Sequence, residues 1–359
     1  MDKDYCFIVK LTDNCNMRCR YCYHFQHNPN HVYNNMPVEI VDRVIDRLIE
    51  HNHRYAHFIW HGGEPLMMGL PFFEHIINKQ KEILRTGNKD IAISNGIQTN
   101  GTLLTNETID FLVDNQFYIG LSLDGDEAMQ NLDRGMTHQA FEAMMKSIDY
   151  LNDRQARYGI LCVVGPNTIG KEQRLFDFYS QNNINNLGFL PLVVANKDGV
   201  DKDHTLSAND FGSFLCNYFD IWVSSGIKGI SVREFDDFIR YQMGFRKKMC
   251  INTGECDLYY TVAPNGDIFP CDCFECSAEN KLGSIMRSID CLDKEAFIQN
   301  LSVQAHIRPK QCEICTFMEM CQGGCAYYRW LSDQKLEKPS FYCTAFKMLY
   351  SHINKFMEA

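Results

Sequence analysis

The chain has 359 residues, 45% of them apolar, which suffices for one large α/β domain with an appendage or for a few smaller domains. Its net charge of −10, with no run of Lys or Arg, argues against nucleic-acid binding, because affinity for phosphates needs a basic face. The sequence lacks an apolar stretch of about 18 residues and a signal-peptide layout, so we expect a cytoplasmic protein without membrane contact.

The first two-thirds of the chain alternate short apolar runs with amphipathic segments. Runs typical of β-strands lie at 5–11, 57–61, 91–99, 118–123, 159–164 and 187–194. Segments with helical periodicity lie at 37–50, 70–84, 106–116, 138–152, 171–183 and 208–223. Such β-then-α units predict parallel strands, and six units are too few to close a TIM barrel. We therefore predict an α/β fold, a partial (β/α)6 TIM barrel over residues 1–245, with its chemistry at the carboxyl ends of the strands.

The cysteine content and the hydrophobic pattern of the sequence change near residue 245. The chain has 17 cysteines, an odd count that suggests metal binding or catalysis rather than a disulfide framework, and most of those after residue 23 lie between 250 and 343. Residues 259–271 predict a β-hairpin, with two β runs joined at Pro-Asn-Gly-Asp, and residues 341–359 predict a helix. We expect a second, cysteine-rich domain over residues 246–359.

Three closely spaced cysteines, Cys15, Cys19 and Cys22, follow the first predicted strand. Three thiolates can hold three irons of a four-iron cluster and leave the fourth iron open, and an open position distinguishes a reactive metal site from a structural one. The alternative interpretation is a zinc site completed by a distant fourth ligand.

This spacing resembles that of the radical S-adenosylmethionine (SAM) enzymes. The resemblance implies that the three cysteines hold a 4Fe-4S cluster whose open iron binds SAM, and that SAM cleavage releases a 5′-deoxyadenosyl radical. It also implies that Tyr21, between the last two cysteines, packs near the adenine. Gly62, Gly63 and Glu64 of the HGGEP motif would bind the methionyl amine, since adjacent glycines let backbone approach a ligand closely.

The motifs QTNGTLL (98–104) and LSLDG (121–125) end the third and fourth predicted strands, and they resemble the loops of that family that contact SAM. The resemblance makes these residues candidates for SAM contacts: Gln98, Asn100, Ser122, Asp124, Arg134 and Val164. Arg134 would pair with the SAM carboxylate, with a surface arginine as the alternative. Val164 would pack on the adenine, although a plain core valine is the simpler interpretation.

The second region offers eight further cysteines in two groups. Eight thiolates suffice for two fully ligated four-iron clusters, although two tetrahedral zinc sites would use the same number. The spacing resembles the SPASM extension of radical SAM enzymes that modify peptides and proteins. By that resemblance one auxiliary 4Fe-4S cluster takes Cys250, Cys256, Cys271 and Cys325, and the other takes Cys312, Cys315, Cys321 and Cys343. With the first cluster and SAM, these two complete the implied set of cofactors.

Six cysteines remain outside these sets. Cys6, Cys162 and Cys216 fall in apolar strand or helix patterns and are expected in the core. Cys273 and Cys276 lie just past a predicted ligand, so each could be a swapped ligand or a free thiol. The pattern assigns no role to Cys291.

Over nearly the whole chain the resemblance is closest to anaerobic sulfatase-maturating enzymes, which oxidise a Ser or Cys of a sulfatase to formylglycine. The shared motifs include GGEP, QTNGTLL, GLSLDG, ILCVV, PCD and CQGGC. In those enzymes an Asp directly after the third SPASM cysteine is the proposed base, and that position is Asp272 here. Its alternative role is to bind or tune the cluster loop. The implied partners are a polypeptide substrate and an electron donor such as flavodoxin or ferredoxin.

Two other functions stay open from the sequence. The same scaffold serves maturases of ribosomally made peptides, which form thioether or carbon–carbon crosslinks or epimerise residues. Many of them carry an additional N-terminal leader-binding domain, for which we expect no room because the first predicted strand starts at residue 5. His61 could touch a substrate or merely pack. A non-catalytic iron–sulfur or zinc scaffold would explain the eight cysteines but not the triplet beside Gly-Gly-Glu-Pro.

Overall fold

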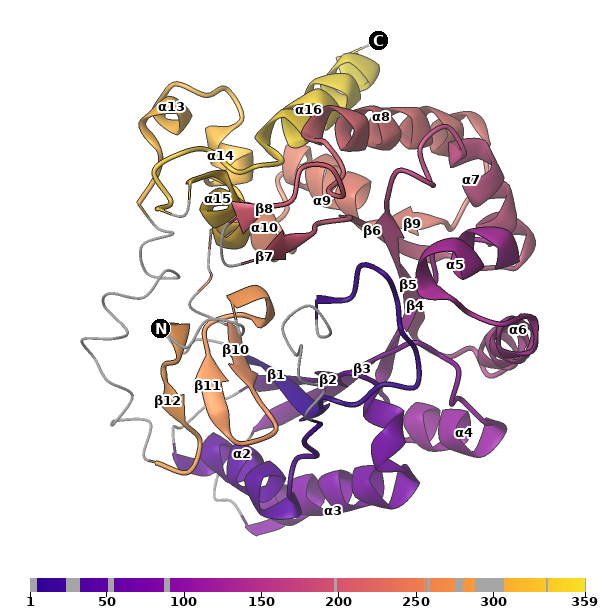
Figure 1. The fold of residues 1–359 in the computed structure, drawn as a ribbon, viewed down its shortest axis with the longest axis vertical. Helices are drawn as coiled ribbons and strands as arrows, with labels where there is room; N and C mark the ends of the chain where they lie inside the picture. The colour runs from indigo at the N-terminus through magenta and orange to yellow at the C-terminus, as the bar shows by residue number, and fades with distance from the viewer. Residues whose placement is uncertain are drawn as a thin grey trace.

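A computed structural model describes residues 5–23, 33–50, 55–86, 91–196, 199–254, 256, 259–274, 280–287, 307–333 and 335–358. Within these ranges, strands form one curved sheet in the order β12-β11-β10-β1-β2-β3-β4-β5-β6-β9. Figure 1 shows the helices along the outside of this arc, and the loop after β1 lying within it. The predicted α/β partial barrel is confirmed.

The central strands all pair in parallel with their neighbours. They are β1 (Tyr5–Thr12), β2 (Tyr55–Gly62), β3 (Ala92–Thr99), β4 (Tyr118–Ser122), β5 (Tyr158–Val164) and β6 (Asn186–Pro191). These match the six predicted strands, except that β6 ends at Pro191, before the predicted end at 194. Beyond β6 the sheet adds β9 (Ser231–Val232), which is too short to be recognised as an apolar run. A separate two-stranded ribbon joins β7 (Ala195–Asn196) to β8 (Gly199–Val200).

Helices follow the strands as the periodicity predicts. They are α2 (Val38–Glu50), α3 (Leu70–Thr86), α4 (Asn106–Asp114), α6 (His138–Asp153), α7 (Glu172–Gln181) and α8 (Ala208–Ser224), with a 3-10 turn η1 (Pro65–Met68) before α3. The sequence analysis missed α5 (Glu127–Arg134) and α9 (Arg233–Gln242), which are short and mostly polar. The ends of α5 still carry recognisable signals. Asp126 caps the first turn by accepting from Ala128 N and Met129 N, and Gly135 ends the helix in the left-handed conformation (φ 64°).

The main core lies between the sheet and its outer helices. Strand residues such as Val9, Phe58 and Trp60 are fully buried there, because the outer helices cover this face of the sheet. The indole of Trp60 donates to Asn95 Oδ1 (2.9 Å), so its one polar atom is satisfied. Within the described part of the chain, no helix is long and apolar enough to cross a membrane.

The cysteine-rich region extends the same sheet. Strand β10 (Tyr259–Val262) pairs in parallel with β1, then β11 (Asp267–Phe269) and β12 (Gly283–Ser284) follow antiparallel, so the predicted hairpin is present. The remaining elements are α10 (Cys250–Thr253), η3 (Asp272–Phe274), α13 (Lys310–Glu313), α14 (Met318–Cys321), α15 (Ala326–Asp333) and α16 (Cys343–Glu358). Helix α16 is the predicted C-terminal helix, and Figure 1 shows it beside α8. The sheet therefore continues across the boundary predicted near residue 245.

Candidate active site

The loop after β1 brings Cys15, Cys19 and Cys22 together at the carboxyl end of the sheet. The amide of Cys22 donates to the carbonyl of Cys19 (3.1 Å), which tightens the loop between them. All three thiols are partly buried, and burial raises the pKa of Cys19 to about 11, with Arg134 opposing the rise and Cys22 adding to it. Protonated, clustered thiols bind a metal by exchanging their protons for it, so this three-thiol set fits a cluster with one open iron.

The two glycines of the HGGEP motif pack directly against the cysteine loop. A Cβ at Gly62 (φ 128°) would lie 2.3 Å from the carbonyl oxygen of Thr12, and one at Gly63 would lie 2.2 Å from that of Asn14. The amides of Gly63 and Glu64 donate to these same carbonyls (2.7 and 2.8 Å). Glycine is therefore needed here for the close approach of two backbone segments, a reason that the sequence pattern did not supply.

Glu64 is fully buried and holds the next loop in place. Its Oε1 accepts from Leu66 N (3.1 Å) and Thr99 Oγ1 (2.7 Å), and its Oε2 accepts from Asn100 N (2.8 Å). Burial raises its pKa to about 7, and these hydrogen bonds oppose the rise. The side chain of Glu64 therefore braces the loop after β3. Its expected contact with a ligand amine stays a prediction.

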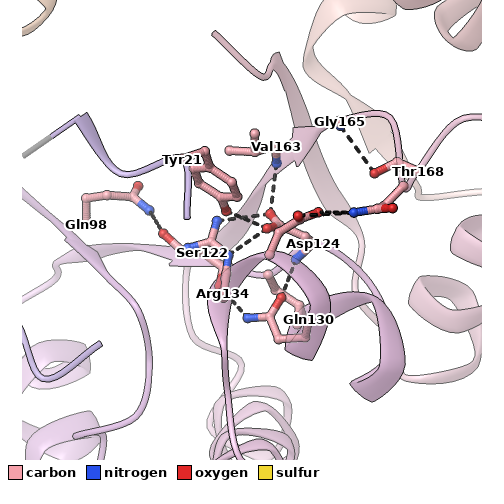
Figure 2. Close-up of polar contacts among 12 residues, drawn as sticks. Tyr21, Gln98, Ser122, Asp124, Gln130, Arg134, Val163, Gly165 and Thr168 are labelled. Atoms are coloured by element: carbon pink, nitrogen blue, oxygen red, sulfur yellow. Dashed lines mark hydrogen bonds and ion pairs between the residues drawn. The ribbon is translucent and has the colours of Figure 1, made fainter. Parts of the chain in front are cut away.

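Asp124 binds two of the side chains that the sequence assigned to the SAM site, Tyr21 and Arg134 (Figure 2). Arg134 donates to both of its oxygens (Nε–Oδ2 2.7 Å, Nη2–Oδ1 2.9 Å), and Tyr21 Oη donates to Oδ2 (2.5 Å). The amide of Val163 donates to Oδ1 (2.9 Å), and Asp124 is only 3% exposed. Arg134 lies over the Tyr21 ring, 5.4 Å from its centroid. Arg134 is thus paired with Asp124, and its expected contact with a ligand carboxylate stays a prediction.

The other predicted SAM contacts lie around this centre. Gln98 Nε2 donates to Ser122 Oγ (3.1 Å), and Figure 2 shows this pair beside Arg134. Asn100 Nδ2 lies 3.6 Å from Cys15 Sγ, so the loop after β3 touches the cysteine loop. Val164 is fully buried, which favours the core interpretation over a contact with adenine.

Replacing Asp124 with asparagine is expected to lower the free energy of unfolding by about 3–5 kcal/mol, because Arg134 would keep a buried charge without its partner. Anaerobic urea denaturation of the purified protein measures this. The matched control is Asp114→Asn, whose carboxylate is 69% exposed and pairs with Arg154 at 3.0 Å. That change should stay within about 0.5 kcal/mol. Equal effects of the two substitutions would contradict a structural role for the buried pair.

The interior of the partial barrel holds a cavity of about 610 Å³, lined in part by Gln98, Tyr118 and Arg233. Glycines make room for these long side chains. A Cβ at Gly120 would lie 2.2 Å from Gln98 Oε1, and one at Gly159 would lie 2.3 Å from Tyr118 Oη. A closed TIM barrel fills this space with layers of branched side chains. Here glycine and polar residues keep part of it open.

The structure gathers the eight later cysteines into the two sets that the sequence analysis proposed. Beside burial, the groups that raise the pKa of Cys325 are Cys250, Cys256 and Cys271. Burial is also the largest cause of the raised pKa of Cys321, and the nearby thiols that raise it further are Cys343, Cys312 and Cys315. The four thiols of the second set line one small cavity together with Phe317 and Tyr350.

The cysteines do not form a site for a single metal ion. Among the described residues, no three His, Cys, Asp or Glu side chains converge tightly enough to chelate one metal ion. The cysteines of a four-iron cluster each bind a different iron, so they need not meet at one point. A cavity lined by four thiols fits a ligand of that kind.

The remaining cysteines divide between the core and the first auxiliary set. Cys162 is buried in the core as predicted, and Cys216 is half-buried on α8. Cys6 was expected in the core as well, but it lies close enough to Cys250 for that thiol to raise its pKa. Cys273 lies close enough to Cys271 for the two thiols to shift the pKa of each other. Cys276 and Cys291 lie outside the described residues.

Asp272 lies at the junction of the two cysteine regions. Tyr23 Oη, one residue past Cys22, donates to its Oδ2 (2.6 Å), and Lys10 Nζ lies 2.8 Å from its Oδ1. The side chain of Asp272 remains 20% exposed. The carboxylate that follows Cys271 therefore touches the loop of the first cysteine triplet.

Two residues of this junction escaped the sequence analysis. Tyr23 was given a packing role at best, and Lys10 was not singled out. Lys10 did carry a signal, because it is a charge in the middle of an otherwise apolar strand, CFIVKLT. His61, opposite Lys10 in the register of β1 and β2, is half-buried, and the Gly62 amide donates to its Nδ1 (2.7 Å).

The N-terminal half of the chain matches a known family. The family described as the radical SAM superfamily matches residues 9–178, from β1 to α7, a range that contains the cysteine triplet and the loops around Glu64 and Asp124. These residues form a radical SAM domain. This part of the chain accordingly belongs to the radical SAM superfamily, as its motifs predicted.

Relatives and solved structures extend the similarity over the whole chain. The cysteine-type anaerobic sulfatase-maturating enzyme of Clostridium perfringens is 27% identical, with 96% of this chain and 95% of that one covered. The serine-type enzyme of Bacteroides thetaiotaomicron is also 27% identical, with coverage of 96% and 88%. The solved structure of native anSMEcpe with bound AdoMet and the Cp18Cys peptide is 26% identical in sequence to this chain, and its TM-score is 0.84. The match covers 99% of this chain and 98% of that one. The chain is thus similar over nearly its whole length to anaerobic sulfatase-maturating enzymes.

Proposed function

We propose that this radical SAM enzyme oxidises a cysteine or serine of a sulfatase polypeptide to formylglycine. The observation that carries the proposal is the hydrogen bond between Tyr23 and Asp272, because it sets a carboxylate from the second region beside the loop of the first cysteine triplet. Radical formation and proton removal need neighbouring groups if both act on one side chain. The named relatives and the peptide in the anSMEcpe structure support a polypeptide substrate.

The proposed cofactors are SAM and three 4Fe-4S clusters. Cys15, Cys19 and Cys22 would hold the cluster that, together with SAM, supplies a 5′-deoxyadenosyl radical. The two later sets, Cys250, Cys256, Cys271 and Cys325 and then Cys312, Cys315, Cys321 and Cys343, would hold the auxiliary clusters. We treat residues 246–359 as the domain that carries them. Gly62, Gly63, Gln98, Asn100, Ser122 and Tyr21 remain the candidates for SAM contacts, while Glu64, Asp124 and Arg134 shape the loops that make them.

The proposed reaction removes two hydrogens from the substrate side chain. One leaves Cβ as a hydrogen atom and completes 5′-deoxyadenosine. The hydroxyl or thiol proton would then pass to Asp272, and a bound, oxidised iron–sulfur cluster would supply the acceptor for one electron. The products are an aldehyde from serine and a thioaldehyde from cysteine, which water hydrolyses to the aldehyde with release of hydrogen sulfide. A partly buried carboxylate within reach of the substrate is suited to the proton-accepting role.

The proposal extends to the surroundings of the enzyme. An external donor such as flavodoxin or ferredoxin would supply the electron that starts each turnover. The compartment would be the reducing cytoplasm, where thiols stay available for clusters.

Anaerobic incubation of the reconstituted enzyme with SAM, a reductant and a sulfatase peptide should give an aldehyde. Mass spectrometry should show loss of two hydrogens from a serine peptide, or that loss with sulfur replaced by oxygen from a cysteine peptide, and the product should react with a hydrazide. A peptide with alanine at the target position is the control. Loss of two hydrogens without hydrazide reactivity would indicate a crosslink and contradict the formylglycine proposal.

A further inference from the structure

Lys10 is a fully buried cation in the middle of β1. Its neighbours in the strand, Val9 and Leu11, are also fully buried. Burying an ammonium group is costly unless an opposite charge and hydrogen bonds compensate it. A lysine at this position therefore needs a specific partner, and a methionine of similar length would fill the same space without that requirement.

The partner is Asp272. Lys10 Nζ lies 2.8 Å from Asp272 Oδ1 and 5.1 Å from the centroid of the Tyr23 ring. His61 on β2 lies next to Lys10 in the sheet, and burial lowers the pKa of His61, so its imidazole is neutral near pH 7. Since the Gly62 amide donates to Nδ1 of His61, the proton of the neutral ring is on Nε2. The ion pair at this position is thus between Lys10 and Asp272.

The two oxygens of Asp272 are held by different parts of the chain. Lys10 holds Oδ1 from β1, and Tyr23 holds Oδ2 from the cysteine loop. Rotation of the carboxylate would break both contacts at once, so its orientation is fixed before a substrate arrives. Fixing a reacting group in advance is worth a large factor in rate, because a misplacement of about 1 Å can cost about 100-fold.

We propose that Lys10 is a positioning residue for the second half of the reaction, in which it fixes the carboxylate of Asp272 against the substrate. The inference rests on the proposed function of this site. Hydrogen-atom abstraction by the 5′-deoxyadenosyl radical does not use Asp272, so it needs no help from Lys10. Completion of the oxidation does use it. Lys10 therefore determines what fraction of radicals generated ends in product.

The test is the ratio of aldehyde formed to 5′-deoxyadenosine formed, with the loaded enzyme and saturating peptide. Lys10→Met should lower this ratio by about tenfold or more while 5′-deoxyadenosine still accumulates. Lys10→Arg, which keeps the charge, should recover part of the ratio. The matched control is Lys79→Met, which removes a lysine paired with Asp46 at 2.9 Å on the outer helices and should leave the ratio unchanged.

A second readout does not depend on turnover. Lys10 Nζ lies 2.8 Å from Asp272, the residue directly after Cys271, so its positive charge should also favour the reduced state of a cluster bound there. Redox titration followed by electron paramagnetic resonance should place the midpoint potential of that auxiliary cluster lower in Lys10→Met than in the wild type. Lys79→Met should leave the potential unchanged.

If Lys10→Met fails to fold, Tyr23→Phe tests whether the fixed orientation of Asp272 matters. This variant removes one hydroxyl and keeps the ring. It should lower the ratio as well, because Oδ2 of Asp272 loses its donor. Unchanged ratios in all foldable variants at both positions would overturn the role of Lys10. A wild-type enzyme that yields 5′-deoxyadenosine but no aldehyde would instead contradict the proposed function, which keeps the two failures distinct.

Discussion

Replacing Cys22 with alanine is expected to abolish cleavage of SAM, so that no 5′-deoxyadenosine forms above background. The triplet would be left with two thiols, too few to keep a four-iron cluster on this loop. The two auxiliary sets lie elsewhere in the structure and should keep their iron, so the variant should retain about two-thirds of the wild-type iron content. Chromatographic assay of 5′-deoxyadenosine and analysis of iron and sulfide measure both effects.

The matched control for this variant is Cys216→Ala. Cys216 is a half-buried thiol on α8 that belongs to none of the three sets. Its replacement should leave both the iron content and SAM cleavage at wild-type levels. A Cys22→Ala enzyme that still cleaves SAM would show that the radical does not originate at this loop.

Replacing Asp272 with asparagine should reduce formylglycine formation by about 100-fold or more while SAM cleavage continues. The amide keeps the shape of the side chain but accepts no proton at neutral pH. It also turns one of its positions from an acceptor into a donor, which conflicts with either Lys10 or Tyr23. Parallel measurement of aldehyde and 5′-deoxyadenosine separates loss of the second step from loss of the first.

Asp267→Asn is the corresponding control, on the strand that precedes Asp272. Asp267 lies on β11 and pairs with Lys281 at 2.7 Å, with its side chain 21% exposed. That change should leave both products within a factor of a few of the wild type. If Asp272→Asn behaved in the same way, Asp272 would be a bracing residue of the cluster loop and another group would take the proton.

The six-strand barrel could be predicted from the sequence because the hydrophobic periodicity of each element and the alternation of strands and helices are both visible in it. Runs such as YIGLSL are long and apolar enough to stand out, and each is followed by a helical stripe. Strand β9 was missed because two residues form no recognisable hydrophobic pattern. Helices α5 and α9 were missed because a short, mostly polar helix has few apolar residues to mark a buried face. The pairing of β10 with β1 joins positions far apart in the sequence, and no local signal specifies it.

For the site, the sequence predicted which loops meet and which cysteines group together. The role of individual carboxylates was not, because Glu64 and Asp124 look in sequence like exposed loop residues that await a ligand. Their burial and their hydrogen bonds to Asn100, Arg134 and Tyr21 come from tertiary packing. Lys10 was overlooked for the opposite reason, since a single charge in an apolar strand attracts attention only when its partner is known.

The parallel pairing of β1 with β10 has a consequence for how the enzyme is made. Cys6 to Val9 face Tyr259 to Val262 across this pair, so β1 is completed by a segment that is synthesised much later. Until that segment arrives, one row of amide and carbonyl groups on β1 is open to other chains. Synthesis thus passes through an interval prone to misassembly, and the N-terminal barrel expressed by itself would keep that exposed row permanently.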